Sequence, residues 1–226
     1  MAGQSVREQF RAFLLRASAQ AKQRRRVMRK FGEKLGFVYF GTVDQHVDDH
    51  KVVRGFSASL THSDDNYMVG AYDGYDITFV DRSDIVSLAD GKVETHQWLI
   101  AEFNLEVAKD IPHLFLIPTH HGSVHYKKVF ASLRALEKTD LEEHSPELRS
   151  RYDIFCVPDR AVDVSMILTP EITQTVAAHF WPTAVEVLDG AVYLYYAEKK
   201  LTEHDLTTIT KNGVWLAQTL DKHTVS

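Results

Sequence analysis

Disulfide bonds, membrane-spanning helices and long apolar runs are all missing from this sequence. Its single cysteine, Cys156, cannot form a disulfide within the chain, which suits a reducing compartment. Because Cys156 lies in the apolar run 152–157, we expect an inert buried thiol rather than a nucleophile. The longest apolar stretch, residues 111–118, is interrupted by Pro112 and His113, and a spanning helix needs about 20 apolar residues. We therefore expect a soluble, cytoplasmic protein.

Recognisable catalytic motifs are missing as well. The sequence contains neither the Gly-x-Ser-x-Gly element of serine hydrolases nor a glycine-rich phosphate-binding loop. The segment His121-Gly-Ser-Val lacks the second glycine of the first motif. A hydrolase that uses paired carboxylates leaves no such signature, because its two groups meet only in the folded protein. The sequence thus favours a non-enzymatic protein and leaves the question of activity open.

The charge is distributed very unevenly along the chain. Residues 1–35 contain ten Lys or Arg and only two Glu, a net charge of +8. Since the whole chain carries −5, residues 36–226 carry −13. A basic N-terminal segment on an acidic body indicates a charged partner but names no reaction.

The basic segment has the pattern of an amphipathic helix. Leu14, Ala21, Met28 and Leu35 recur at intervals of seven, and phenylalanines widen this apolar stripe. One residue interrupts the stripe, because Arg24 falls on its apolar side. We predict a helix over residues 1–35, followed by a body over residues 36–222 with two sub-units, 36–125 and 126–222.

The body has the pattern of an α+β protein. In the N-terminal part of the body, the residue pattern predicts strands at 37–40, 52–60, 114–117 and from His96 to Val107. It also predicts a hairpin over 67–80 that turns at Asp73-Gly74, and a further turn at 89–92. The hairpins indicate a mostly antiparallel sheet. The second half predicts a smaller αβ unit: a helix at 127–136, capped helices after Ser145 and Thr169, a strand at 152–157, a hairpin over 185–196, and a C-terminal helix from Thr202 to about 222.

Two groups of histidines suggest a metal site. The first is His46-Val-Asp48-Asp-His50, with His62, Asp64 and Asp65 following it. The second is His120-His121-Gly-Ser-Val-His125. Imidazole and carboxylate together bind divalent transition metals. The alternative is that these are ordinary loop residues, and no other cofactor is indicated.

The basic helix admits three functions. It can pack on its own body or a neighbouring protein, lie on an anionic lipid surface, or grip nucleic-acid phosphates. The acidic body repels nucleic acid, which makes that partner the least favoured. The cations that would carry the binding are Arg16, Lys22, Arg24, Arg25, Arg26, Arg29 and Lys30.

The second half of the body resembles a conserved bacterial domain family of unknown function. The resemblance covers roughly residues 36–222, and its residues are Ser145-Pro-Glu-Leu-Arg-Ser-Arg-Tyr-Asp-Ile154, Asp159, Ile167-Leu-Thr-Pro170, the hairpin 185–196, and Tyr67-Met-Val-Gly-Ala-Tyr-Asp-Gly74. In that family a Ser-x-Glu-Phe segment leads to a strand, an Asp and a Leu-Thr-Pro helix start. The resemblance implies no catalytic residues.

This chain departs from the family pattern in two ways. Leu148 stands where the family has phenylalanine, and the basic helix stands where many members carry membrane helices. We therefore predict a bacterial, non-enzymatic module that binds a protein partner or an anionic membrane surface through its N-terminal helix, in the cytoplasm or at the inner face of the membrane. A metal-dependent hydrolase and a nucleic-acid-binding protein are the alternatives. The oligomeric state is not indicated.

Overall fold

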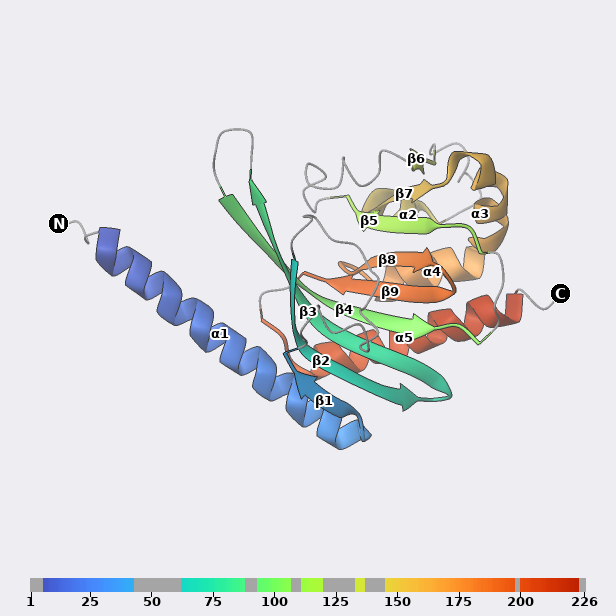
Figure 1. Cartoon of the computed structure of the whole chain (residues 1–226). Helices are drawn as coiled ribbons and strands as arrows, with labels where there is room; N and C mark the ends of the chain where they lie inside the picture. The colour runs from blue at the N-terminus through green and yellow to red at the C-terminus, as the bar shows by residue number, and fades with distance from the viewer. Residues whose placement is uncertain are drawn as a thin grey trace.

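One antiparallel sheet forms the centre of the protein (Figure 1). The computed structural model describes residues 6–42, 62–87, 93–106, 111–119, 133–136, 145–197 and 200–223. The described strands are β1 (Val38–Gly41), β2 (His62–Tyr72), β3 (Tyr75–Ser87), β4 (Val93–Asn104), β5 (Leu114–Pro118), β6 (Arg134–Ala135), β7 (Tyr152–Cys156), β8 (Ala184–Leu188) and β9 (Ala191–Tyr196). Their order in the sheet is β1-β2-β3-β4-β9-β8-β5-β7-β6.

Helices precede, interrupt and close this sheet in the sequence. They are α1 (Val6–Leu35), α2 (Pro146–Arg151), a 3-10 turn at Pro158–Arg160, α3 (Ala161–Ile167), α4 (Pro170–His179) and α5 (Glu203–His223). The predicted N-terminal helix, the antiparallel sheet and the C-terminal helix are confirmed, and the fold class is α+β.

Both predicted Asp-Gly hairpins are confirmed. Asp73 and Gly74 have φ angles of 51° and 89°, and Asp189 and Gly190 have 50° and 74°. Two consecutive residues with positive φ make the tight turn whose twist matches the strands on either side. Each turn joins two neighbouring antiparallel strands. Tyr72 pairs with Tyr75 where β2 meets β3, and Leu188 pairs with Ala191 where β8 meets β9.

The second hairpin lies in the middle of the sheet. β9 pairs with β4, and β8 pairs with β5, so β8 and β9 separate two strands of the first half. The strands predicted for sub-units 36–125 and 126–222 therefore alternate in a single sheet. A hairpin that follows α4 in the chain contributes the most central strands, which no local pattern indicated.

The helix caps follow the sequence closely. Ser145 caps α2 and Thr169 caps α4, each followed by proline in the first turn. At α5, the Asp205 backbone N–H donates to Thr202 Oγ1 at 3.2 Å, and the Thr202 N–H donates to Asp205 Oδ2 at 2.8 Å. This reciprocal capping box forms at the start of the helix predicted from Thr202.

Some predictions differ from the structure or lie outside the described residues. The helix predicted at 127–136 is wrong at its described end, because Arg134–Ala135 pairs with β7 as a strand. Backbone pairing with a neighbouring strand overrides the local helical pattern there. Helix α3 was not predicted. The strand expected at 52–60 and the turn at 89–92 lie outside the described ranges.

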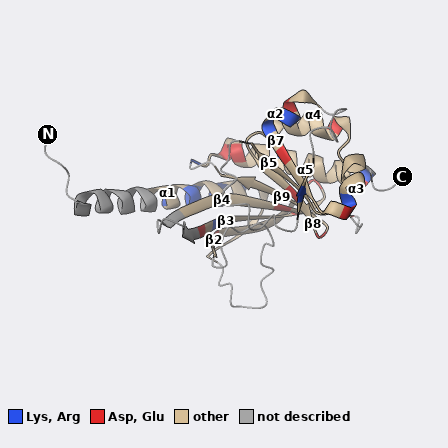
Figure 2. Ribbon diagram, turned by 90° about the horizontal axis from the view of Figure 1, so that it is seen from above, with Lys and Arg blue, Asp and Glu red and all other residues tan. Residues whose placement is uncertain are grey.

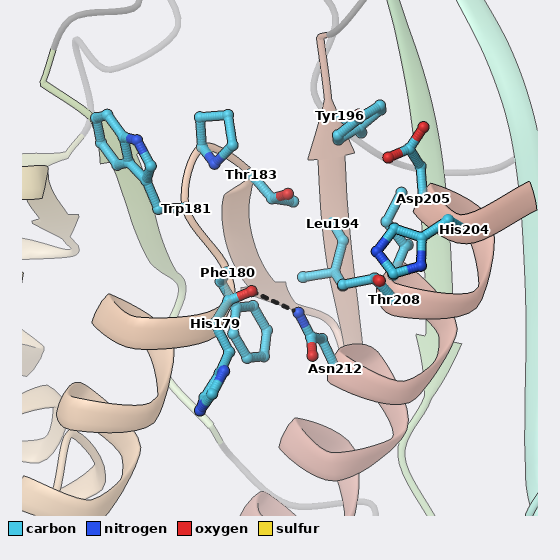
Figure 3. Close-up of a pocket in the computed structure, with 12 residues that line it drawn as sticks. His179, Phe180, Trp181, Thr183, Leu194, Tyr196, His204, Asp205, Thr208 and Asn212 are labelled. Atoms are coloured by element: carbon cyan, nitrogen blue, oxygen red, sulfur yellow. Dashed lines mark hydrogen bonds between the residues drawn. The ribbon is translucent and has the colours of Figure 1, made fainter. Parts of the chain in front are cut away.

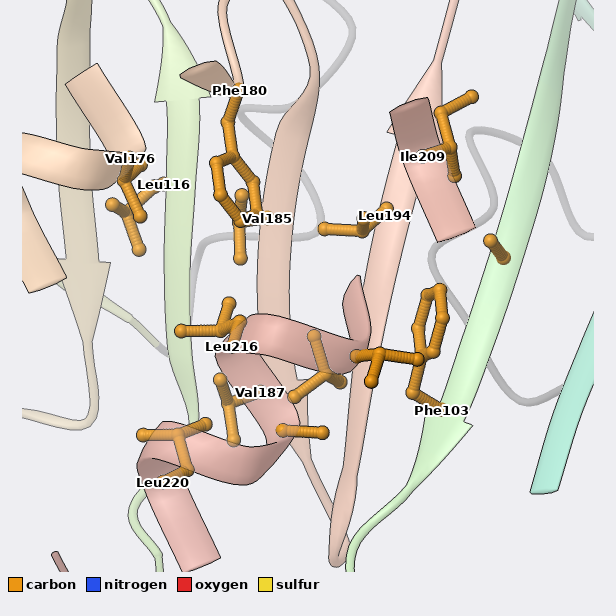
Figure 4. Close-up of a cluster of buried hydrophobic side chains, with 14 of the residues drawn as sticks. Phe103, Leu116, Val176, Phe180, Val185, Val187, Leu194, Ile209, Leu216 and Leu220 are labelled. Carbon is orange, nitrogen blue, oxygen red and sulfur yellow. The ribbon is translucent and has the colours of Figure 1, made fainter. Parts of the chain in front are cut away.

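Both faces of the central strands are buried. On one face, side chains from α1, α2, α3, α4 and α5 pack against alternate strand residues in one large apolar cluster. Figure 4 shows part of this cluster, where Leu216 and Leu220 of α5 lie near Val187 of β8, and Val176 of α4 lies beside Leu116 of β5. The opposite face carries a smaller, aromatic-rich cluster that includes Trp98, Phe115, Tyr193 and Tyr195.

Gly213 allows α5 to approach the sheet closely. Glycine is unfavourable inside a helix by about 1 kcal/mol relative to alanine, yet Gly213 lies in the middle of α5. A Cβ atom at this position would overlap the ring of Phe103, which is fully buried on β4. The residue that weakens the helix therefore permits the contact between helix and sheet.

We expect Gly213→Ala to destabilise the protein despite its better helix propensity. Overpacking a buried contact costs about 1–3 kcal/mol, and the gain in propensity offsets about 1 kcal/mol of it. Urea denaturation should show a lower midpoint for Gly213→Ala and an unchanged midpoint for Lys211→Ala, an exposed position on the same helix. A Gly213→Ala protein as stable as the parent would contradict the close approach.

Candidate functional site

The C-terminal half of α1 packs on the sheet through one side of the helix. Arg24, Met28 and Phe31 are buried on this side, and Phe31 makes an edge-to-face contact with Phe79 of β3 at 6.2 Å between ring centroids. The helix ends at Leu35, and the φ of +75° at the next residue, Gly36, lets the Phe37 N–H donate to the Gly32 carbonyl at 2.8 Å. The described part of the predicted amphipathic stripe is thus a packing surface.

A buried ion pair joins α1 to β3. The Arg24 guanidinium donates from Nε to both carboxylate oxygens of Asp81, at 3.2 and 3.1 Å, and Nη2 also contacts Oδ1. Asn66 Nδ2 donates to Asp81 Oδ2 at 2.8 Å, and Tyr39 donates to Asn66 Oδ1 at 2.7 Å. The two charges are almost fully buried, with exposed fractions of 2% and 1%. This network explains why an arginine lies on the apolar stripe.

The role predicted for Arg24 is therefore corrected. We expected Arg24 to bind a partner together with the neighbouring cations, but its side chain is engaged inside the protein by Asp81. The desolvation of a buried charge is offset only by a counter-charge in good geometry. Arg24 is a structural residue, and the run Arg24-Arg25-Arg26 divides between the interior and the surface.

The remaining described cations of α1 form an exposed surface, which we call the basic face. Its members are Lys22, Arg25, Arg26, Arg29 and Lys30, and all five side chains are exposed. Figure 2 shows Lys and Arg side by side on the described part of α1. Lys30 lies eight positions after Lys22 on the helix, so the row is about 12 Å long. The side chain of Arg16, the other predicted member, lies outside the described residues.

Few acidic groups neutralise the C-terminal end of this face. Arg29 pairs with Glu33 at 3.0 Å, and Glu203 at the start of α5 accepts from Lys34 at 2.7 Å and lies 3.7 Å from Lys30. The hydrogen bond from Lys34 and its positive charge lower the pKa of the Glu203 carboxyl. These pairs are exposed and screened by solvent, so they leave the basic face available to a partner.

A second group of charges lies on the opposite face of β2, β3 and β4. Arg82 donates to both carboxylate oxygens of Asp64, at 2.8 and 2.7 Å, and both side chains are buried. In the next row, Asp84 of β3 is directly opposite His62 of β2 and His96 of β4. Burial, and then the nearby charge of Arg82, lower the pKa of the His62 imidazole, which favours its neutral form. The sequence singled out His62 and Asp64 but not Asp84 or His96.

The predicted metal ligands are not placed by the structure. All six of them lie outside the described residues: His46, Asp48, His50, His120, His121 and His125. Within the described ranges, no group of three His, Cys, Asp or Glu side chains is arranged to hold a metal ion. The metal site therefore stays a prediction.

A small pocket opens between the end of α4 and the start of α5. It has a volume of about 180 Å³ and is lined by His179, Phe180, Trp181, Pro182, Thr183, Leu194, Tyr196, His204, Asp205, Thr208, Ile209 and Asn212. Figure 3 shows that His204, Thr208 and Asn212 come from α5, across from the turn that carries Trp181. Asn212 Nδ2 donates to the His179 carbonyl at 2.9 Å and holds the two helices together. No sequence pattern indicated this pocket, because its residues come from three separate segments: 179–183, 194–196 and 204–212.

A buried carboxylate stabilises the aromatic-rich face of the sheet. Glu186 on β8 accepts from the Tyr195 hydroxyl and lies 2.7 Å from His113 Nε2. Glu186 and Tyr195 are buried. Buried polar groups that are paired in this way are usually structural, so we do not assign a catalytic function to them.

We expect Arg24→Met to destabilise the protein by about 3–5 kcal/mol, because Asp81 would be left buried without its counter-charge. The double variant Arg24→Met/Asp81→Asn removes both charges and should recover part of this loss. Arg26→Met, on the exposed side, should change the free energy of unfolding by less than about 0.5 kcal/mol. Chemical denaturation of these proteins and of the single variant Asp81→Asn measures the coupling, and additive effects of Arg24→Met and Asp81→Asn would contradict a direct ion pair.

Comparison with known proteins identifies a similar fold but no family. Neither a family model nor a curated protein matches the chain, so the resemblance to a bacterial family of unknown function stays a prediction. Within the described residues, no helix has the length and apolar character needed to cross a membrane. The crystal structure of the mycobacterial trehalose monomycolate transport factor A, TtfA, is similar over 89% of this chain and 94% of that one, with a TM-score of 0.57 and 10% identity. At this identity the likeness shows that the two proteins share a fold.

Proposed function

We propose that the protein is a non-enzymatic module that docks on an anionic membrane surface through the basic face of α1. The observation that carries this proposal is the division of α1 into two sides. One side is buried against β2 and β3 through Met28 and Phe31, and the other presents five exposed cations. The C-terminal half of the helix is thus packed on the sheet while these cations lie on its exposed side.

The chemistry of the basic face favours lipid over other partners. The cores of protein–protein interfaces are depleted in charged residues, and in lysine especially, whereas each Lys or Arg near an anionic bilayer contributes about 1 kcal/mol of attraction. A straight row of cations suits a surface of spread negative charge. The net charge of −13 on the rest of the chain repels nucleic acid and anionic lipid alike, so either partner has to meet the basic face.

One further observation supports a role at a membrane. A structural neighbour is named a transport factor for trehalose monomycolate, and an accessory role of this kind needs no catalytic group. A protein partner at the same membrane fits this function.

We expect binding to vesicles that contain anionic lipid to depend on the basic face. Replacing Lys22, Arg26 and Lys30 with Gln should weaken binding roughly a hundredfold, because three cations contribute about 1 kcal/mol each. Co-sedimentation at low and high salt measures this loss, and high salt should weaken binding by the parent protein.

The matched control replaces three exposed lysines outside α1, Lys200, Lys211 and Lys222, with Gln. It changes the net charge by the same amount and should bind like the parent. Equal losses in both variants would show attraction by net charge alone, and no vesicle binding by the parent chain would overturn the proposal. Circular dichroism checks that each variant is folded.

A further inference from the structure

We propose that the pocket between α4 and α5 binds a small neutral molecule with a hydroxylated ring, such as a monosaccharide or an inositol. This site is separate from the basic face of α1. Its argument rests on the size of the pocket, the absence of a free charge in its lining, and the arrangement of its polar and aromatic side chains (Figure 3).

The size of the pocket limits the ligand to about one ring. Pockets for drug-sized ligands are typically about 300–1,000 Å³, and this one has about 180 Å³. Its floor is formed by buried residues, among them Phe180, Leu194 and Ile209. Its rim includes Trp181, one of the few large apolar side chains of the described chain with an exposed fraction as high as 36%.

The charges at the pocket disfavour an ionic ligand. The twelve lining residues include no Lys or Arg, so an anion would find no permanent counter-charge there. The carboxylate, Asp205, accepts both the N–H and the hydroxyl of Thr202 through Oδ2, at 2.8 and 2.6 Å. Its charge is therefore committed to the cap of α5 and disfavours an anion further. A neutral ligand needs no counter-charge and is not repelled by the Asp205 carboxylate.

The polar side chains at the pocket suit a ring that carries hydroxyl groups. Three other threonines of α5 donate to the carbonyl four residues earlier: Thr207, Thr210 and Thr219. In the described part of the structure, Thr208 makes no such bond, and its hydroxyl lines the pocket. The imidazole of His204 and the hydroxyl of Thr183 line it as well. Each of these groups can donate and accept, as a polyol requires.

The arrangement is held in place before any ligand arrives. The capping box fixes Asp205, and the hydrogen bond from Asn212 to the His179 carbonyl fixes the end of α4 against α5. Trp181 is supported by an edge-to-face contact with Tyr152 at 5.8 Å between ring centroids. Aromatic rings offer an apolar face to the C–H groups of a sugar ring, while its hydroxyls bind the polar side chains. Pre-organisation of this kind lowers the entropic cost of binding.

Saturation-transfer NMR on the full chain tests the site with methyl α-glucopyranoside, galactose and myo-inositol as probes. Inorganic phosphate, which has no non-exchangeable protons to observe, is the contrast and is added as a competitor, while isothermal titration calorimetry measures its own binding. We expect at least one polyol to bind in the millimolar range and phosphate to bind less well. Thr208→Val should weaken that binding roughly fivefold, the effect of one lost neutral hydrogen bond. Lys211→Ala, on the same helix outside the pocket, should bind like the parent.

A second pair of variants separates a ligand contact from a folding defect. Trp181→Phe keeps an aromatic face at the rim and should retain binding, whereas Trp181→Ala should lose it. Because Trp181 packs on Tyr152, Trp181→Ala is expected to melt at a lower temperature, and circular dichroism checks that it is folded at the temperature of the binding experiment. Binding of phosphate in preference to every polyol would overturn the neutral ligand. No binding of any polyol, or binding that survives both Thr208→Val and Trp181→Ala, would overturn the site.

Discussion

The buried ion pair between Arg24 and Asp81 determines how α1 lies on the sheet. Hydrophobic contacts alone permit a helix to slide or rotate by a residue, whereas a buried charge is stable only opposite its partner. Asp81 also accepts from Asn66, which in turn accepts from Tyr39 on the edge strand. One network therefore links α1, β1, β2 and β3, and it sets which side of α1 faces the solvent.

The orientation of α1 has a direct consequence for function. With Arg24 turned inward, the other described cations of the helix point outward together. The acidic remainder of the chain does not cancel them, because the pairs with Glu33 and Glu203 involve only the C-terminal end of the row. Charge separation along the sequence thus becomes charge separation in space, which is what a module that docks on an anionic surface requires.

The insertion of the β8–β9 hairpin between β4 and β5 places the pocket. Because α4 leads into this hairpin and α5 follows it, the end of α4 and the start of α5 meet at the same edge of the molecule. The polar groups at that pocket come from positions up to 33 apart in the sequence, as do the Asn212 side chain and the His179 backbone carbonyl. The basic face and the pocket lie on different helices, so one protein offers two separate surfaces for binding.

Local signals in the sequence were sufficient for the elements themselves. Seven-residue spacing marked α1, Asp-Gly pairs marked both hairpins, and Ser145, Thr169 and Thr202 marked three helix starts, because turns and caps depend on residues within a few positions of one another. Strand order, the strand at Arg134–Ala135 and the inward turn of Arg24 depend on distant partners such as Cys156 and Asp81. The sequence by itself thus determined the spacing of the cations. Their division between interior and surface was decided only by the tertiary structure, as was the pocket, because both require packing of segments that are distant in the chain.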